Sequence, residues 1–135
     1  MLELCSIASG SSGNCICVGT DDCHVLIDAG ISGKKIENGL NEFDMTATDM
    51  QGILVTHEHI DHIKGLKVFL KKYNVPVYAT SAVLRYLSVY DCVPPEAELC
   101  EIDDRGFILG GMLIEPFATS HDSIGSRGYS VSTPD

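Results

Sequence analysis

The sequence predicts one domain of the α/β (α+β) class, in which short buried strands alternate with amphipathic helices. Residues 52–56 form an apolar run of strand length, and residues 63–73 carry apolar side chains at helical spacing with lysines between them. The same order recurs in Val75–Ala79, predicted as a strand, and Ala82–Tyr90, predicted as a helix. Two strand-to-helix units in succession, with further strands on both sides, favour this class.

The first elements are predicted from alternating patterns and turn residues. Leu2–Ile7 and Asn14–Val18 are expected to be strands, joined by the glycine and serine turn at residues 9–14. Backbone amides in such a turn could cradle an anion. The turn lacks the Lys-Ser/Thr ending of a nucleotide-binding P-loop, so a plain hairpin connection is the preferred interpretation.

The later elements follow from burial and capping signals. His24–Asp28 is predicted as a buried strand that ends in an acid, and His24 is interpreted as a structural histidine. Ser32 is expected to cap a short helix that runs through Phe43, and Ser81 is expected to cap the helix that follows it. Further strands are expected at residues 98–102, 106–109, 112–119 and from 129 onward.

Composition narrows the class of protein. The chain has 135 residues, of which 44% are hydrophobic, enough for one modest core. No run of about 18 apolar residues and no export signal is visible, so a cytoplasmic location without membrane contact is expected.

The net charge of −10 argues against binding of nucleic acid by the whole surface but does not exclude a local binding site. Four lysines between residues 64 and 72 could supply one, although a solvated helix face is the preferred interpretation.

The six cysteines show no C-x-x-C spacing, so reduced thiols are expected. Cys15 and Cys17 are two residues apart in a predicted strand and should share one face. Buried thiols of this kind behave as small apolar side chains. A soft metal site built from Cys15, Cys17, Cys23 and His24 is the alternative.

One stretch concentrates side chains of the metal-binding type: Thr56-His57-Glu58-His59-Ile60-Asp61-His62. It lies between a predicted strand and a predicted helix, in the kind of loop that commonly carries function. Side chains two residues apart point the same way in an extended loop, so His57 and His59 can converge on one ion. Asp61 and His62 follow at the turn into the helix and can reach a second ion. Imidazole and carboxylate ligands suit zinc, with manganese or iron as alternatives.

The spacing from His57 to His62 resembles the HxHxDH signature of the metallo-β-lactamase superfamily. This resemblance implies an αββα sandwich and a metal-dependent hydrolase. Flavodiiron oxidoreductases of the superfamily usually carry glutamate where this chain has His59, so His59 favours a zinc-type hydrolase. Glu58 and Ile60 are then spacers, whose side chains point away from the metals.

Two further positions match the superfamily by resemblance. Asp28-Ala29-Gly30 resembles its first motif, in which an aspartate closes an early strand and orients a metal-bound histidine or its loop. Capping of a turn is the alternative role for Asp28. His121 follows a strand where a histidine completes the first metal site, giving three protein ligands with the first two motif histidines. Asp61 and His62 would hold the second ion.

Ser120-His121-Asp122, the later Gly128-Tyr129 and the segment at residues 8–14 are similar to the YycJ/WalJ-like branch of the superfamily. That branch is bacterial and cytosolic and is associated with DNA nuclease activity. The resemblance implies a phosphodiesterase that acts on a substrate such as DNA. It would use two zinc ions and a metal-bound hydroxide, with Asp61 as the catalytic carboxylate. A thioester or lactone hydrolase and an inactive metal-binding or partner-binding fragment are the alternatives.

Members of the superfamily continue for another half-domain, which supplies a bridging aspartate and a final histidine. Residues 1–135 are therefore expected to form one incomplete domain, the N-terminal half of the sandwich, with little hydrolytic activity of its own. The inner strand faces should lack their partner layer. A broad exposed apolar patch or a homo-oligomer would follow. The affected residues are Val25, Ile27, Leu54 and Leu113.

Overall fold

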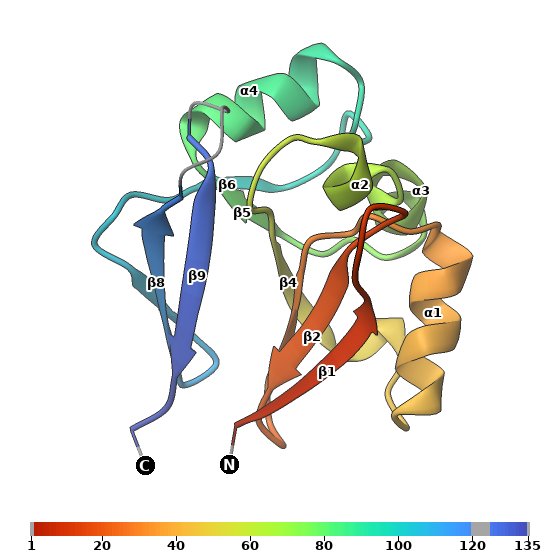
Figure 1. Ribbon diagram of the computed structural model, residues 1–135, viewed down its shortest axis with the longest axis vertical. Coiled ribbons are helices and arrows are strands. Elements are labelled where there is room, and N and C mark those ends of the chain that lie inside the picture. Colours follow the sequence, from red (N-terminus) through yellow and green to blue (C-terminus); the bar gives the residue numbers. More distant parts are fainter. Residues whose placement is uncertain (1, 120–124, 135) are drawn as a thin grey trace.

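The computed structural model describes residues 2–119 and 125–134 and has three layers (Figure 1). The middle layer is a six-stranded sheet, whose strands lie in the order β1 (Glu3–Ala8), β2 (Cys15–Gly19), β3 (His24–Ile27), β4 (Met50–Leu54), β5 (Val77–Ala79) and β6 (Leu99–Glu101). A smaller sheet covers part of one face with β7 (Phe107–Leu109), β8 (Met112–Ala118) and β9 (Arg127–Ser132). The other face carries the helices α1 (Gly33–Glu42), η1 (Ala47–Asp49), α2 (Ile60–Ile63), α3 (Leu66–Lys72) and α4 (Ser81–Val89). The predicted α/β class is confirmed.

The direction of the strands brings two loops to one edge of the large sheet. β1, β2 and β3 pair antiparallel, whereas β3 and β4 pair parallel, with Ile27 opposite Leu54. Because parallel strands end at the same edge, Asp28 after β3 and the histidine loop after β4 emerge side by side. The candidate site is built at this edge.

The core between the helices and the large sheet contains the two strand cysteines. Cys15 and Cys17 are 0% and 1% exposed and belong to the same cluster as Phe69 of α3. The prediction that they share one buried face is confirmed. Cys23 belongs instead to the core between the two sheets, so the alternative soft metal site from Cys15 to His24 is wrong.

The core between the two sheets overturns the expectation of an uncovered inner face. Val25 and Leu54 are fully buried, and they pack with Met112 and Ile114 of β8. Ile27 packs at the border of this cluster. The hairpin β8–β9 of this same chain therefore supplies a partner layer.

Apolar side chains are exposed on the outer face of the small sheet instead. Leu113 lies between two buried neighbours and is 38% exposed, because successive side chains of a strand alternate between faces. Ile108 and Phe117 are 73% and 53% exposed. The exposed apolar patch thus lies on the side opposite the one expected.

The predicted helix over residues 63–73 is interrupted near Gly65, which separates α2 from α3. A Cβ at Gly65 would lie 1.7 Å from the carbonyl oxygen of Ile31, so only glycine allows the chain at residue 65 to approach the loop at Ile31 this closely. The Gly65 amide donates to the Ala29 carbonyl oxygen at 2.9 Å. The break therefore results from packing against the loop that follows β3.

The two predicted helix caps have different outcomes. The Ser32 Oγ accepts from the Lys35 amide at 3.2 Å, which confirms the first cap. Ser81 is itself the first residue of α4, and Thr80 precedes it, so the second cap is wrong. The Thr80 hydroxyl instead donates to the Gly125 carbonyl oxygen at 2.8 Å and so joins the start of α4 to the chain just before β9.

Among the described residues, no helix is long and apolar enough to cross a membrane.

The buried thiols predict a loss of stability in alkali. Burial raises the pKa of both Cys15 and Cys17 to about 12, whereas an unfolded cysteine titrates near 8.5. Between about pH 8.5 and about 12 the folded chain retains protons that the unfolded chain has lost, so the unfolding free energy falls by up to about 1.4 kcal/mol per pH unit for each thiol. Urea unfolding at a series of pH values measures this slope. A Cys15→Ala variant should show a shallower slope, and equal slopes would contradict the assignment.

Two neighbouring residues of β8 test how the small sheet packs. Ile114→Ala removes a fully buried side chain and should lower the unfolding free energy by about 2–5 kcal/mol. Leu113→Ala, the matched control on the outer face, should cost less than about 1 kcal/mol. Both are measured by denaturant unfolding, and equal losses would show that β8 does not pack as described.

Candidate metal centre

Three segments meet at the edge of the large sheet where β3 and β4 end. The Asp28 amide donates to the Leu54 carbonyl oxygen, and the Ala29 amide donates to the His62 carbonyl oxygen, both at 2.8 Å. The Asn14 amide donates to the Asp61 carbonyl oxygen, also at 2.8 Å. The loop after β3, the histidine loop after β4 and the turn before β2 are thereby held together by their backbones.

Gly30 allows this close crossing. A Cβ at Gly30 would lie 1.8 Å from the Asp61 carbonyl oxygen, so any other residue would push the two loops apart. The Gly30 amide donates to the Asn14 carbonyl oxygen at 2.8 Å. The crossing therefore needs glycine at position 30 for space, in addition to the Asp28 carboxylate for its hydrogen bonds.

The Asp28 carboxylate is the centre of the hydrogen bonds at this crossing. It is 3% exposed, and its Oδ1 accepts from the Thr56 amide at 2.8 Å. Its Oδ2 accepts from the Thr56 hydroxyl at 2.8 Å and from the His62 Nδ1 at 2.5 Å. The backbone of Asp28 has φ +66°, a left-handed conformation that aspartate tolerates better than most residues.

These bonds fix which ring nitrogens carry protons. A carboxylate only accepts hydrogen bonds, so the His62 Nδ1 must donate and its Nε2 keeps a lone pair. The Thr56 hydroxyl has one proton, which it donates to Asp28. Its oxygen therefore accepts a hydrogen bond from the His57 Nδ1 at 2.8 Å. Both imidazoles are thus set with the lone pair on Nε2, the form in which histidine binds a metal.

The charge state of His62 follows from the same contacts. Burial of the ring lowers its pKa, but the hydrogen bond that His62 donates to Asp28 and the negative charges of Asp28 and Asp61 outweigh burial and raise the pKa. In the metal-free chain, His62 therefore holds a second proton more readily than an ordinary histidine. A cation that binds the His62 Nε2 would compete with this second proton.

Asp61 and His62 present neighbouring donor atoms. The Asp61 Oδ2 lies 3.6 Å from the His62 Nε2. The Asn14 side-chain amide lies 3.3 Å from each of these two atoms. The carboxylate and the imidazole that were predicted to share an ion are thus adjacent, and Asn14 bridges them.

The other two motif histidines lie against this pair. The ring centroids of His57 and His59 are 4.4 Å apart, and those of His57 and His62 are 3.9 Å apart. His57 is 3% exposed, and the spacer Ile60 is 69% exposed. In residues 2–119 and 125–134, however, no three His, Cys, Asp or Glu side chains are grouped closely enough to hold one ion. Within the described residues, the three rings lie in contact with one another.

The predicted ligand His121 lies outside the described residues, but the residues that follow its segment are bonded to the chain just before the motif. The Arg127 amide donates to the Thr56 carbonyl oxygen at 2.8 Å, and the Tyr129 hydroxyl donates to the Val55 carbonyl oxygen at 2.9 Å. The Thr119 and Ser126 hydroxyls are 2.7 Å apart. The start of β9 is therefore attached to the residues that precede His57.

The lysines near the motif are largely engaged by other groups. Lys67 pairs with Asp91 at 2.6 Å, and Lys72 pairs with Glu37 at 2.9 Å. The Lys64 ammonium donates to the Ser12 carbonyl oxygen at 2.7 Å and ties the turn before β2 to the motif helix. The interpretation as an ordinary helix face is favoured over a basic site for nucleic acid.

Two side chains of this site were not singled out by their sequence. Asn14 was expected to end a plain hairpin turn, yet its amide lies between Asp61 and His62. Thr56 was expected to close a strand, yet its hydroxyl links Asp28 to His57. Asparagine after a glycine and serine turn, and threonine directly before a histidine motif, are the only local signals for these roles.

A family profile and curated relatives place the chain in the same family. The family profile described as the metallo-β-lactamase superfamily matches residues 8–115. The exodeoxyribonuclease YycJ of Bacillus anthracis is 39% identical over 123 residues, which is 90% of this chain and 47% of that protein. The exodeoxyribonuclease WalJ of Streptococcus pneumoniae is 36% identical over 129 residues, 91% of this chain and 47% of that protein. The chain thus spans about half the length of these curated relatives.

Solved structures agree on the fold. A metallo-β-lactamase of Cronobacter sakazakii with a HARLDQ motif superposes with a TM-score of 0.77 at 20% identity. The match covers 92% of this chain and 55% of that structure. The predicted likeness to the N-terminal half of this fold and to the YycJ/WalJ-like branch is confirmed.

The contact between Asp28 and His62 can be tested in the metal-free chain. Asp28→Asn removes the charge and keeps a residue that tolerates the left-handed backbone. With that charge gone, burial should dominate, and the pKa of His62 should fall. NMR titration of the imidazole measures the shift, with Asp49→Asn as a control at a distant carboxylate. A His62 pKa that is the same in Asp28→Asn and in the original chain would contradict the described geometry.

Proposed function

Because the chain belongs to the metallo-β-lactamase superfamily, we propose that the whole protein is a metal-dependent phosphodiesterase that cleaves DNA at a dinuclear zinc site. Members of this superfamily typically bind metal ions. The observation that carries the proposal is the crossing of Asp28, Thr56 and His62, which sets two imidazoles in the metal-binding form. The names of the relatives YycJ and WalJ support a nuclease over other hydrolases.

The proposed ligands follow from the donor atoms. His57 and His59 would hold the first ion together with His121, and the anchored ends of the 120–124 segment support the choice of that third ligand. Asp61 and His62 would hold the second ion, since their donor atoms are already adjacent.

Zinc at these positions would supply Lewis acidity and a hydroxide nucleophile at neutral pH. The residues of the chain have separate tasks. Asp28 and Thr56 hold the proton on Nδ1 of each imidazole, and Asp28 keeps His62 oriented. The Asp61 carboxylate would accept a hydrogen bond from the attacking water or hydroxide and so orient it. The Asn14 amide, beside the Asp61 Oδ2, can donate to a substrate oxygen.

Hydrolysis of a thioester or lactone is the second candidate. The net charge of −10 and the engagement of Lys67 and Lys72 by carboxylates favour it, because neither provides a broad surface for phosphates. The same donor set can polarise a carbonyl oxygen. The relatives named as exodeoxyribonucleases favour the phosphodiesterase.

The proposal predicts activity that depends on Asp61. The whole protein, loaded with zinc or manganese, should degrade linear DNA. Asp61→Ala should reduce kcat by roughly 100-fold or more, because it removes both a ligand and the partner of the nucleophile. Glu58→Gln, which changes a carboxylate between two motif residues and is assigned no ligand role, should stay within about threefold.

Fluorescent DNA, a generic phosphodiester and a thioester are compared as substrates in this assay. Full activity of Asp61→Ala would contradict the two-metal proposal. Turnover of the thioester with none of the phosphodiester would replace the first candidate by the second.

A further inference from the structure

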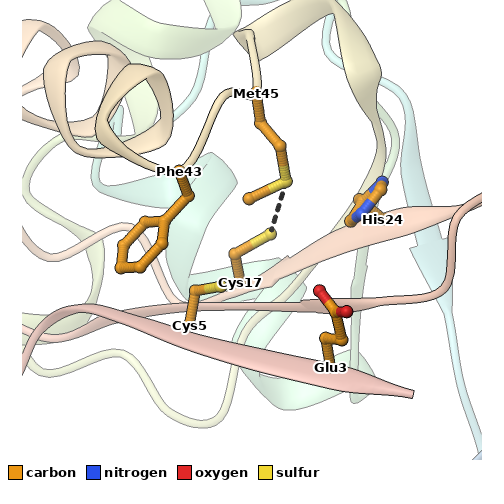
Figure 2. A pocket seen from close by; sticks show the side chains of 6 residues that line it. All are labelled: Glu3, Cys5, Cys17, His24, Phe43 and Met45. Atoms are coloured by element: carbon orange, nitrogen blue, oxygen red, sulfur yellow. Dashed lines mark hydrogen bonds between the residues drawn. The ribbon is translucent and has the colours of Figure 1, made fainter. Parts of the chain in front are cut away.

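A pocket lined by cysteine, methionine and histidine side chains lies at the far end of β3 from Asp28. This pocket of about 160 Å³ opens between the β1 edge of the large sheet and the chain that follows α1 (Figure 2). Its lining residues are Glu3, Cys5, Cys17, His24, Phe43 and Met45. None of these residues belongs to the candidate metal centre.

The fold brings three sulfur atoms to this pocket. Cys5 of β1 and Cys17 of β2 are directly opposite each other in an antiparallel pair, so their side chains leave the same face of the sheet. Met45 reaches this face from the other side of the pocket, and its Sδ lies 3.9 Å from the Sγ of Cys17 (Figure 2). Two thiols and a thioether therefore line one hollow.

The pocket offers access from solvent as well as soft donors. Cys17 is 1% exposed at the bottom, Cys5 is half-buried, and Phe43 is 45% exposed at the rim. Soft sulfur ligands favour Cu(I), zinc and iron–sulfur clusters, and of these only Cu(I) commonly takes a methionine thioether. Zinc sites use cysteine, histidine or carboxylate ligands, and the described part of the chain has no group of three such side chains at binding distance.

We propose that this pocket binds one thiophilic monovalent cation of the Cu(I) class through the sulfur atoms of Cys5, Cys17 and Met45. Each thiol gives up its proton to water on binding, so one cation replaces two protons and the pocket gains a net charge of −1. The oxidation state of the metal does not change. The half-buried His24 imidazole lines the same pocket but is assigned no ligand role. This site is independent of the proposed nuclease function.

Competition for Cu(I) tests the proposal. The chain is titrated anaerobically with Cu(I) in ascorbate against bathocuproine disulfonate, and X-ray absorption identifies the ligand atoms. One Cu(I) per chain with sulfur neighbours is expected. Cys5→Ser and Met45→Leu should each weaken binding by roughly tenfold or more, because each removes one soft donor. Cys92→Ser and Met50→Leu, a half-buried thiol and a buried thioether outside the pocket, are the matched controls and should bind as the original chain does.

Cys5 and Met45 are chosen because both are partly exposed, so their variants should fold, as circular dichroism will verify. Unchanged Cu(I) affinity in both variants would overturn the proposal. Copper surrounded by nitrogen, which indicates binding at the histidine loop, would overturn it as well.

Discussion

The buried carboxylate of Asp28 is the interaction on which the rest of the site depends. A carboxylate that is 3% exposed is costly unless hydrogen bonds replace its water, and Asp28 accepts three of them. All three come from the histidine loop, so satisfying this one group also fixes the end of β4 and the His62 ring. The sheet makes the arrangement possible, because parallel pairing of β3 and β4 places both loops at one edge.

Much of this could be predicted because its signals are local. The apolar runs, the Ser32 cap and the metal-binding side chains at residues 57–62 are each visible within a short window. The interruption near Gly65 could not be predicted, because it arises from contact with Ile31, which is distant in sequence. For the same reason the turn at residues 9–14 gave no indication that Asn14 would meet His62.

The covering of the inner sheet face shows a different limit of sequence patterns. Alternation in β8 predicts a strand with one buried face, but it does not say which layer that face meets. The structure shows that Ile114 packs on Val25 and Leu54, so half the length of the relatives still contains a core between two sheets. β3 also separates two groups of potential donor atoms, with nitrogen and oxygen beyond its end at Asp28 and sulfur near its start at His24.

Anomalous diffraction from crystals of the zinc-loaded whole protein can show whether Asp28 orients the histidine loop to hold metal. One peak is expected about 2.0–2.1 Å from nitrogens of His57 and His59 and a second beside Asp61 and the Nε2 of His62, with the His62 Nδ1 still on Asp28. Zinc peaks away from residues 57–62, or a His62 ring turned so that Nδ1 binds the ion and Asp28 loses its contact, would contradict it.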